Sequence, residues 1–560
     1  MGKIRHRFKK YPGTLVLPGD SFDIDNLQIL GRRVAGKEFL QGIASNLKDY
    51  EELDILVNSE KDKEYLRSII NPLVNKKNNI QIHTSLKYLD LNKIENIHIP
   101  GPDIEKWSII RAGYNSNKFS ITGIIHTLCS NTIINGFKEY IFGGLESWDA
   151  LVCTSSTGKQ VVQKIINYYH ESFERKYKIR LSSEKIPKLF KIPLAVNDIT
   201  FDNSLTREEK RFKSREKLGI SKDAIVILFL GRLSFHGKSH PLTLYKSVSK
   251  ISSQNKNKEI ILLECGTFPN KNAERLYNEL IRSFNSLIVK RVGGISKATE
   301  ESKIDALNSS DIFVSLSDNI QETFGLTLIE AMAAELPCIV SDWDGYRDIV
   351  KDSQTGYLIP TKYPKYEDDK IDNLDKEYKI GNINFDYMIG LKSMKTVIDE
   401  NALEKKLDLL INNKEVRVKM ANESRKRWEN VFTWTVVSHQ YRALWSNLRE
   451  IRKKNDKTER SFSFHPSIDY IFKEYPTERY NEKELIVKEL CIKPEILSFH
   501  LHSKLVDIIT SNHTKKIINF LNNNKRITIQ DLAEIGIDQN KQIEIMALIE
   551  KLGIATTNTI

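Results

Sequence analysis

Two glutamates eight positions apart, Glu322 and Glu330, are the first residues in this sequence whose spacing suggests chemistry. The apolar run 312–316 before them predicts a buried strand, and the stretch from Gly325 to Pro337 predicts a helix. Glu322 therefore falls in the loop at the mouth of a helix, where free N–H groups and a partial positive charge favour an electron-rich or anionic ligand. Glu330 falls inside the apolar helix, where an unpaired carboxylate would be costly.

The stretch Glu322-Thr-Phe-Gly-Leu-Thr-Leu-Ile-Glu330 resembles the E-x7-E motif of retaining, family-4-like glycosyltransferases (glycosyl transferases group 1) with the two-lobed GT-B architecture. The resemblance implies that Glu330 binds the ribose hydroxyls of a nucleotide and that Glu322 holds the donor sugar. It also implies donor binding by the residues that follow Glu322, which are Thr323, Phe324, Gly325 and Leu326. Two glutamates at this spacing also occur by chance in surface helices, but the apolar surroundings of Glu330 favour the functional interpretation.

Cations follow another predicted strand. The almost wholly apolar run 224–230 predicts a parallel strand buried on both faces, and Gly231 and Arg232 come directly after it. In the family that the motif resembles, an arginine here and a lysine a few residues later bind the donor diphosphate, and such cations neutralise a leaving group. Lys238 is the matching lysine, although it stands one position later than in the family pattern, and His236 could share its role.

The N-terminal part offers a glycine loop. The run 14–18 predicts a first strand, Gly31 is expected to end the loop after it, and a helix is expected from about Val34. The resemblance places such a loop beside the donor phosphates, which makes Gly31, Arg32 and Lys37 candidates for donor binding. An ordinary strand-to-helix turn fits these residues equally well.

A histidine follows the β-rich stretch that begins at Phe119. The pattern brings His126 to the carboxyl end of a strand, which is where α/β sheets bind ligands. The resembled family has a histidine at the matching place, close to the sugar hydroxyls. A lone histidine is more often structural, but its position favours a site residue.

The order of predicted elements indicates an α/β protein of GT-B architecture, with two Rossmann-like doubly wound lobes facing a cleft and a small C-terminal helical, winged-helix-like module. We place the acceptor-side lobe at 1–197 and the donor-side lobe at 198–435. A crossover helix and linker occupy 436–455, because this part resembles the family helix that packs back onto the first lobe. The accessory module occupies 456–560. A polar insertion at 361–395 departs from the family pattern and is expected to be a surface loop.

The composition is that of a globular protein. Its formal charge of +12 with a pI near 9.1 would attract partners that carry phosphate, but a background rich in isoleucine, lysine and asparagine accounts for the charge equally well. Five scattered cysteines without a C-x-x-C spacing support neither a disulfide framework nor a zinc site, and fit a reducing compartment. The resemblance implies that no metal and no cofactor are needed and that a nucleotide-diphosphate sugar is the co-substrate. The expected location is cytoplasmic, with peripheral contact at the inner face of the membrane as an option.

The sequence thus predicts a glycosyltransferase that acts on a glycan, lipid or protein acceptor, for example in bacterial envelope glycan synthesis. One alternative is a non-catalytic nucleotide- or carbohydrate-binding scaffold whose C-terminal module docks a protein partner. A nucleic-acid-binding protein is disfavoured, because residues 538–551, the expected recognition helix, carry a net charge of −1. The basic, aromatic-containing stretch 159–191 fits either a membrane- or polyanion-facing patch or a solvated helical face, and the second is favoured.

Overall fold

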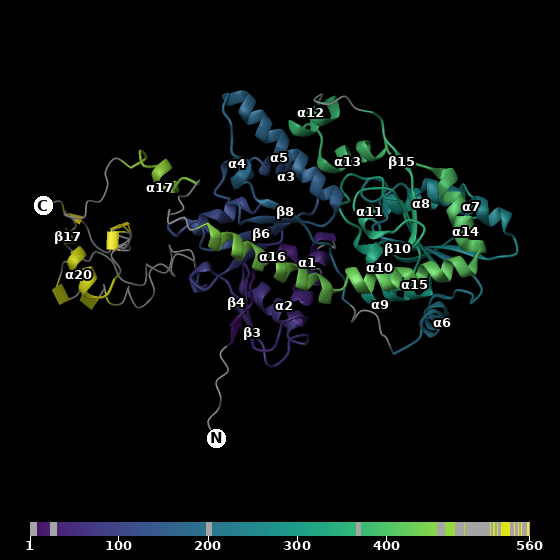
Figure 1. Ribbon diagram of the computed structural model, residues 1–560, viewed down its shortest axis with the longest axis horizontal. Helices are drawn as coiled ribbons and strands as arrows, with labels where there is room; N and C mark the ends of the chain where they lie inside the picture. The colour runs from purple at the N-terminus through teal and green to yellow at the C-terminus, as the bar shows by residue number, and fades with distance from the viewer. Residues whose placement is uncertain are drawn as a thin grey trace, which may run out of the picture. The chain divides into compact units, whose positions relative to one another are not determined.

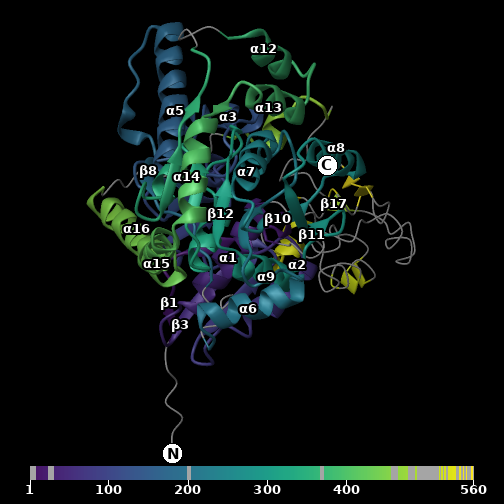
Figure 2. The same cartoon turned by 90° about the vertical axis from the view of Figure 1, so that its right-hand side faces the viewer.

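The computed structural model describes residues 8–22, 31–197, 204–365, 371–455 and 465–476, together with short parts of the remaining C-terminal segment. The chain divides into two units, residues 1–464 and 465–560. The first unit contains two lobes, each built on a parallel sheet with helices packed against it (Figures 1 and 2).

In the first lobe, the described residues form an eight-stranded parallel sheet in the order β1-β3-β2-β5-β6-β7-β8, with β4 beside β3. Its strands are β1 (Lys9–Lys10), β2 (Thr14–Val16), β3 (Glu51–Leu56), β4 (Asn79–His83), β5 (Asn96–Ile99), β6 (Ser120–Ile124), β7 (Ala150–Cys153) and β8 (Lys188–Lys191). The covering helices are α1 (Gly31–Ser45), α2 (Glu60–Ile70), α3 (Asn131–Gly136), α4 (Glu139–Phe142) and α5 (Ser156–Tyr177). Helix α1 begins at Gly31 rather than near Val34, so Gly31 belongs to the helix and does not end the loop.

In the second lobe, the described residues form a six-stranded parallel sheet in the order β11-β10-β9-β12-β13-β14. Its strands are β9 (Ile225–Leu230), β10 (Ile260–Thr267), β11 (Ile288–Gly294), β12 (Ile312–Ser315), β13 (Cys338–Ser341) and β14 (Gly356–Ile359). Its helices are α6 (Arg207–Leu218), α7 (Leu242–Gln254), α8 (Lys271–Arg282), α9 (Glu300–Ser309), α10 (Leu326–Ala333), α11 (Tyr346–Ile349), α14 (Glu400–Asn412) and α15 (Lys414–Val431). Because the strand order reverses between β9 and β12, their carboxyl ends frame the crevice in which such sheets bind ligands.

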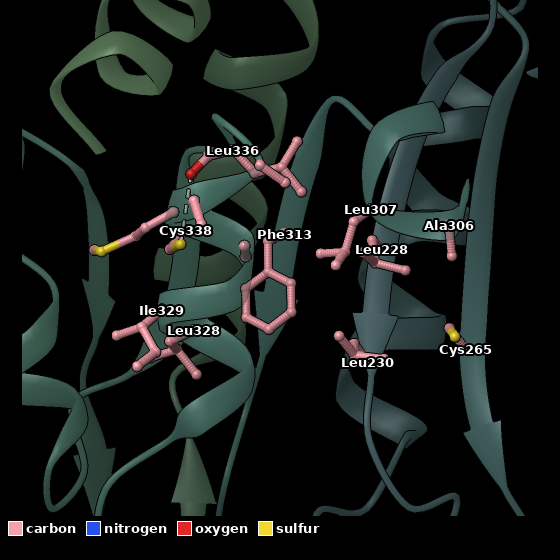
Figure 3. Close-up of a cluster of buried hydrophobic side chains, with 14 of the residues drawn as sticks. Leu228, Leu230, Cys265, Ala306, Leu307, Phe313, Leu328, Ile329, Leu336 and Cys338 are labelled. Atoms are coloured by element: carbon pink, nitrogen blue, oxygen red, sulfur yellow. Dashed lines mark hydrogen bonds between the residues drawn. The ribbon is translucent and has the colours of Figure 1, made fainter. Parts of the chain in front are cut away.

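Apolar strands explain why this sheet forms where it does. Strand β9 is buried along its whole length, as a parallel strand covered on both faces must be. Figure 3 shows part of the core on one side, where Leu228 and Leu230 of β9, Phe313 of β12 and Leu328 of α10 lie among other buried side chains. This packing fixes α10, and with it the loop that carries Glu322, against the end of β12.

The polar insertion is not a surface loop, which corrects the sequence-based expectation. It contains β15 (Thr361–Lys362), α12 (Asn373–Lys379) and α13 (Phe385–Ser393), and β15 pairs antiparallel with β16 (Val397–Ile398), which follows the insertion. Met388 and Ile389 of α13 are buried, so the insertion has apolar contacts of its own. Residues 366–370 lie outside the described part.

Helix α16 (Trp434–Lys454) belongs by packing to the first lobe. Trp434, Tyr441 and Trp445 are buried in the same apolar core as α1 and the first sheet. Near its end, Arg452 donates to the Lys118 carbonyl at 2.9 Å and to a Glu95 carboxylate oxygen at 2.8 Å. The chain therefore enters the second lobe after residue 197 and returns to the first lobe near residue 433.

The C-terminal unit is described only in parts. They include α17 (Ile468–Ile471), α20 (Ile529–Glu534) and the antiparallel pair β17 (Ile486–Val487) and β18 (Thr557–Asn558). Thr528 and Asp531 form a capping box that begins α20, and Gly536 follows the helix with a φ of 83°. Most of the predicted winged-helix-like module, including half of 515–524 and most of 542–557, lies outside the described residues.

Together these findings confirm the predicted fold class, an α/β protein with two Rossmann-like lobes in the GT-B arrangement.

Candidate active site

Three side chains meet at the carboxyl ends of adjacent strands of the second sheet. The Nζ atom of Lys238, in the loop after β9, lies 2.5 Å from Oε2 of Glu322, in the loop after β12. The hydroxyl of Tyr346, which begins α11 after β13, accepts from the same Nζ at 3.2 Å. Ser315, the last residue of β12, lies 2.9 Å from that hydroxyl through its Oγ atom. The cluster therefore occupies the crevice where the strand order reverses.

The charges in this cluster stabilise each other. Burial opposes the charge of Lys238, but the Glu322 carboxylate and the Tyr346 hydroxyl outweigh it and raise the pKa of the ammonium. Burial likewise opposes the charge of Glu322, but Lys238 and the backbone amides of Phe324 and Thr323 lower the pKa of the carboxyl. Both groups are therefore charged at neutral pH, and the loop presents an anion and a cation side by side.

Glycine is required where the Glu322 loop enters α10. Gly325 has a φ of 112°, and a Cβ atom at this position would lie 2.6 Å from Cε1 of Tyr346. A side chain would thus be strained by the backbone and would displace the tyrosine that contacts Lys238. Phe324 is buried and packs on Phe432, whereas Thr323 accepts from Thr154 of the first lobe through its carbonyl at 3.4 Å. Leu326 is partly buried against the core of the second lobe.

Glu330 lies in α10 and has a partner that the sequence did not reveal. Lys303 of α9 donates to its Oε1 at 2.8 Å and also pairs with Glu300 at 2.5 Å. Because Lys303 satisfies the carboxylate, the burial of Glu330 is not in itself evidence for a ligand. Glu38 of the first lobe lies near this pair, and burial and the Glu330 charge raise the pKa of Glu38 to about 7. Its Oε2 accepts from the Asn197 amide at 2.9 Å.

Arg232 remains exposed at the end of β9. Its Nη2 atom donates to the Gly237 carbonyl at 2.9 Å, within the loop that also carries His236 and Lys238. Gly231, with a φ of 153°, lets the Lys238 side chain run across its α-carbon, because a Cβ there would meet Lys238 Cε at 3.4 Å. Between the described residues, no hydrogen bond or ion pair joins Arg232 to Glu322 or Glu330.

His126 follows β6 in the first lobe and is held in one tautomer. Its Nε2 atom lies 3.0 Å from the Pro100 carbonyl, so this nitrogen must donate and Nδ1 is the acceptor. Burial lowers the pKa of His126 to about 4, the bond to Pro100 opposes this, and the charge of Arg32 adds to the lowering. The ring is therefore neutral at physiological pH and offers a hydrogen-bond acceptor.

The other first-lobe candidates lie on α1. Gly31 and Arg32 are exposed at its start, and Lys37 is partly buried further along. Arg32 and Arg33 both donate to the carboxylate of Asp20, so Asp20 fixes the start of the helix. No atom of the described residues lies within 4 Å of a Cβ built on Gly31, so the described residues leave this backbone open to a ligand.

The loop after β13 carries an aspartate with an unusual backbone conformation and a buried carboxylate oxygen. Asp344 has a φ of 40° and a buried Oδ2 atom with no hydrogen-bond partner among the described residues. Burial raises the pKa of Asp344 to about 7, the Gly345 amide opposes this, and the charge of Glu322 adds to the rise. A non-glycine residue in the left-handed region is a signal of function, but only coordinates show it. Lys303 and Glu38 escaped prediction, because their partners are distant in the sequence.

The same loop also joins the two lobes. Asp348 accepts from the amide of Ser156 at the start of α5, from its Oγ at 2.9 Å, and from Lys191 Nζ at 3.1 Å. Thr157 Oγ1 donates to the Asp344 carbonyl at 3.3 Å. The Glu322 cluster therefore lies beside a polar junction between the lobes.

Within the described part of the chain, no group of three or more His, Cys, Asp or Glu side chains could hold a metal ion. No helix in that part is long and apolar enough to cross a membrane.

Residues 210–380 match the family model for glycosyl transferases group 1. This region contains Arg232, Lys238, Glu322 and Glu330. The phosphatidyl-myo-inositol mannosyltransferase of Mycobacterium leprae (strain TN) is 34% identical over 83 residues, 15% of this chain and 22% of that protein. The protein of the same name from Mycobacterium tuberculosis H37Rv is 25% identical over 154 residues, 27% of this chain and 38% of that protein. These curated relatives are thus matched over well under half of their own length.

Among solved structures, the glycosyltransferase from Rickettsia africae ESF-5 aligns with a TM-score of 0.49 and 17% identity, over 79% of this chain and 99% of that one. The family match and the names of the relatives support a transferase enzyme.

Proposed function

We propose that this protein is a retaining glycosyltransferase that moves a sugar from a nucleotide-diphosphate sugar to a hydroxyl acceptor. The observation that carries the proposal is the cluster of Lys238, Glu322 and Tyr346 at the carboxyl ends of β9, β12 and β13. It lies in the region that matches the glycosyl transferases group 1 model. Such a crevice is where doubly wound sheets bind nucleotides.

The cations in this crevice suit a donor diphosphate. Arg232 is exposed and its planar guanidinium can donate two parallel hydrogen bonds to phosphate oxygens. Lys238 is held charged beside Glu322 and adds a second cation. Together they stabilise the negative charge that develops on the diphosphate as the glycosidic bond breaks. The proposal therefore requires no metal ion and no cofactor.

Carboxylates and a neutral imidazole suit the sugar and the ribose. Glu322 accepts from a sugar hydroxyl through Oε1, the oxygen atom that Lys238 leaves open, and the Nδ1 atom of His126 accepts another hydroxyl. Glu330 accepts from the ribose hydroxyls beside its ion pair with Lys303. The acceptor hydroxyl then attacks from the face that the diphosphate leaves, which retains the anomeric configuration. We assign no protein nucleophile.

The acceptor in this proposal is a glycan, a lipid or a protein glycan, and the setting is the cytoplasmic side of a bacterial envelope. Acceptor binding requires residues other than those that bind the donor, because the donor candidates belong mainly to the second lobe.

The test compares Arg232→Ala with the matched control Arg275→Ala, an exposed arginine on α8. Thermal shifts with UDP, GDP and ADP should identify one nucleoside diphosphate that stabilises the wild-type protein and the control but not Arg232→Ala. The corresponding nucleotide sugars should then be hydrolysed slowly without acceptor, and NMR should show that the released sugar keeps its anomeric configuration. A protein that binds none of the nucleotides, or an Arg232→Ala variant with full activity, would contradict the assignment.

A further inference from the structure

The far end of α5 carries an exposed basic and apolar segment. Residues 175–180, Arg-Lys-Tyr-Lys-Ile-Arg, contain four cations and no acidic side chain, and all six residues are exposed. Tyr177 is 56% exposed and Ile179 is 50% exposed. Lys178, with a φ of 54°, ends the helix, so the segment forms a projecting corner.

A second exposed apolar surface lies on the insertion of the other lobe. Tyr387, Leu391 and Met394 follow each other at helical spacing along and just after α13, and they are 56%, 38% and 74% exposed. Met388 and Ile389 point to the opposite side and are buried. Helix α13 thus packs against the lobe through the side that carries Met388 and Ile389. Its outer side, which carries Tyr387, Leu391 and Met394, is apolar and has no partner among the described residues.

The two surfaces are joined through α3. Tyr378 of α12 accepts from the Asn131 amide at 3.3 Å, and the Asn131 side chain donates to the Tyr378 carbonyl at 3.0 Å. At the other end of α3, Tyr169 of α5 donates to Asn135 at 3.3 Å and lies under the Lys138 ammonium at 5.2 Å. In both Figure 1 and Figure 2, the end of α5 and α12 stand at the upper edge of the first unit.

We propose that this shared face, made of residues 175–180 and the outer side of α12 and α13, docks onto an anionic lipid bilayer. Clustered cations are attracted by anionic headgroups, while exposed aromatic and aliphatic side chains enter the boundary between headgroups and acyl chains. Acidic side chains on the same helices weaken the field, but they do not separate the four cations of the corner. They are Glu171 and Glu174 of α5, Asp375 and Glu377 of α12, and Asp386 of α13. An acidic groove-binding peptide fits less well, because the exposed side chains come from convex helix surfaces.

The consequence for substrate rests on the proposed function. Docking through both lobes would hold the cleft at a fixed height over the bilayer, and it therefore favours an acceptor hydroxyl on a membrane-embedded lipid. The docking itself requires no transfer chemistry and is measured separately.

The experiment uses the full chain and vesicles of phosphatidylcholine alone or of equal parts phosphatidylcholine and phosphatidylglycerol. The charge variant is Lys176→Gln with Lys178→Gln and Arg180→Gln, and the apolar variant is Tyr387→Ser with Leu391→Ser and Met394→Ser. The matched control is Lys213→Gln with Lys222→Gln and Lys256→Gln, three exposed lysines of the second lobe. Co-flotation with the vesicles and nucleotide thermal shifts are measured for each.

Wild type and control should float with the anionic vesicles and not with phosphatidylcholine alone. The charge variant should lose roughly a hundredfold in partition, at about fivefold per cation, and the apolar variant should also detach. Nucleotide binding should be unchanged in all variants, so a failed transfer assay leaves the docking result readable. Equal flotation of the charge variant and wild type overturns the proposal. The proposal is also overturned if the wild-type protein does not bind lipid but forms a dimer that the apolar substitutions dissociate. Binding of the wild-type protein to RNA in place of lipid overturns it as well.

Discussion

The Nζ atom of Lys238 lies 2.5 Å from Oε2 of Glu322, with both side chains largely buried at 13% and 19% exposure. In this arrangement the cation proposed to bind the donor diphosphate is already neutralised by the carboxylate proposed to bind the sugar. Donor binding must therefore share or rearrange the pair, so the pair links the two halves of the donor in one site. The pair also stabilises the fold. Its contribution to stability and its contribution to donor binding can be measured separately.

Breaking the pair from one side should destabilise the protein. Lys238→Met leaves Glu322 buried without its cation and should lower the free energy of unfolding by about 3 kcal/mol. Glu322→Gln leaves the ammonium unpaired and should cost a similar amount, while the double variant should cost less than the sum. Denaturant titrations of the full chain, followed through a signal from the second lobe, measure the free energy of unfolding of all three variants. The exposed pair Arg275–Glu279 is the control, since Arg275→Ala should cost less than about 0.5 kcal/mol. Additive losses would show that Lys238 and Glu322 do not stabilise each other.

The raised pKa of Asp344 predicts a pH dependence. Burial lifts it from 3.8 to about 7, so the folded protein binds a proton that the unfolded chain has lost between these values. The stabilising contribution is thus complete below pH 3.8 and is lost as the pH rises through 7. Asp344→Asn should keep the left-handed backbone. Its stability relative to wild type should rise between pH 3.8 and pH 7 and should exceed that of wild type at pH 8.5 by on the order of 1–3 kcal/mol, with no such gain at pH 3.5.

Donor binding should follow the same titration. Above pH 7 the ionised Asp344 places a second carboxylate near Glu322, which repels an anionic diphosphate. Calorimetry should show wild-type affinity for the nucleoside diphosphate falling between pH 6 and pH 8.5, and a much smaller fall for Asp344→Asn. Identical pH profiles in the two proteins would remove Asp344 from the site.

The sequence contains enough information for the lobes but not for all of the site. The apolar runs at 224–230 and 312–316 predicted buried strands, and the structure has β9 at 225–230 and β12 at 312–315. Lys303 and Glu38 were missed because each reaches its partner through the packing of separate helices. Their side chains carry no local pattern.

The insertion was misread for a different reason. Its polar composition hides an apolar inner side that only Met388 and Ile389 supply. The helix starts were nevertheless visible, because Asp372 and Asn384 are N-cap residues that accept from the amides of Asp375 and Tyr387. In this insertion, the N-cap residues thus indicate the helix starts better than hydrophobic periodicity does.

Two glycines should respond oppositely to substitution by alanine. Gly325→Ala adds a Cβ 2.6 Å from Tyr346 at a φ of 112°, so it should lower stability by about 2–4 kcal/mol and disturb the Lys238 cluster. Gly31→Ala meets no atom within 4 Å and should leave stability unchanged or raise it by less than about 1 kcal/mol. Thermal unfolding compares the two.

The Gly31→Ala variant also tests whether the backbone at Gly31 binds a donor phosphate. If a donor phosphate approaches the Gly31 backbone, the added methyl group should weaken nucleoside diphosphate binding without lowering the melting temperature. Unchanged binding in Gly31→Ala would assign this glycine to an ordinary helix start.

Helix α16 should behave as part of the first lobe although it follows the second in sequence. Trp445 is fully buried, its ring fills the space above Gly13, and its Nε1 donates to Thr122 Oγ1 at 3.2 Å. Trp445→Ala should therefore cost about 3–5 kcal/mol, whereas Asn447→Ala on the exposed side of the helix should cost less than about 0.5 kcal/mol. Hydrogen exchange locates the loss: amides of β2 and β6 should exchange faster in Trp445→Ala, while those of β9 and β12 keep their protection. Faster exchange confined to the second sheet would contradict the assignment of α16 to the first lobe.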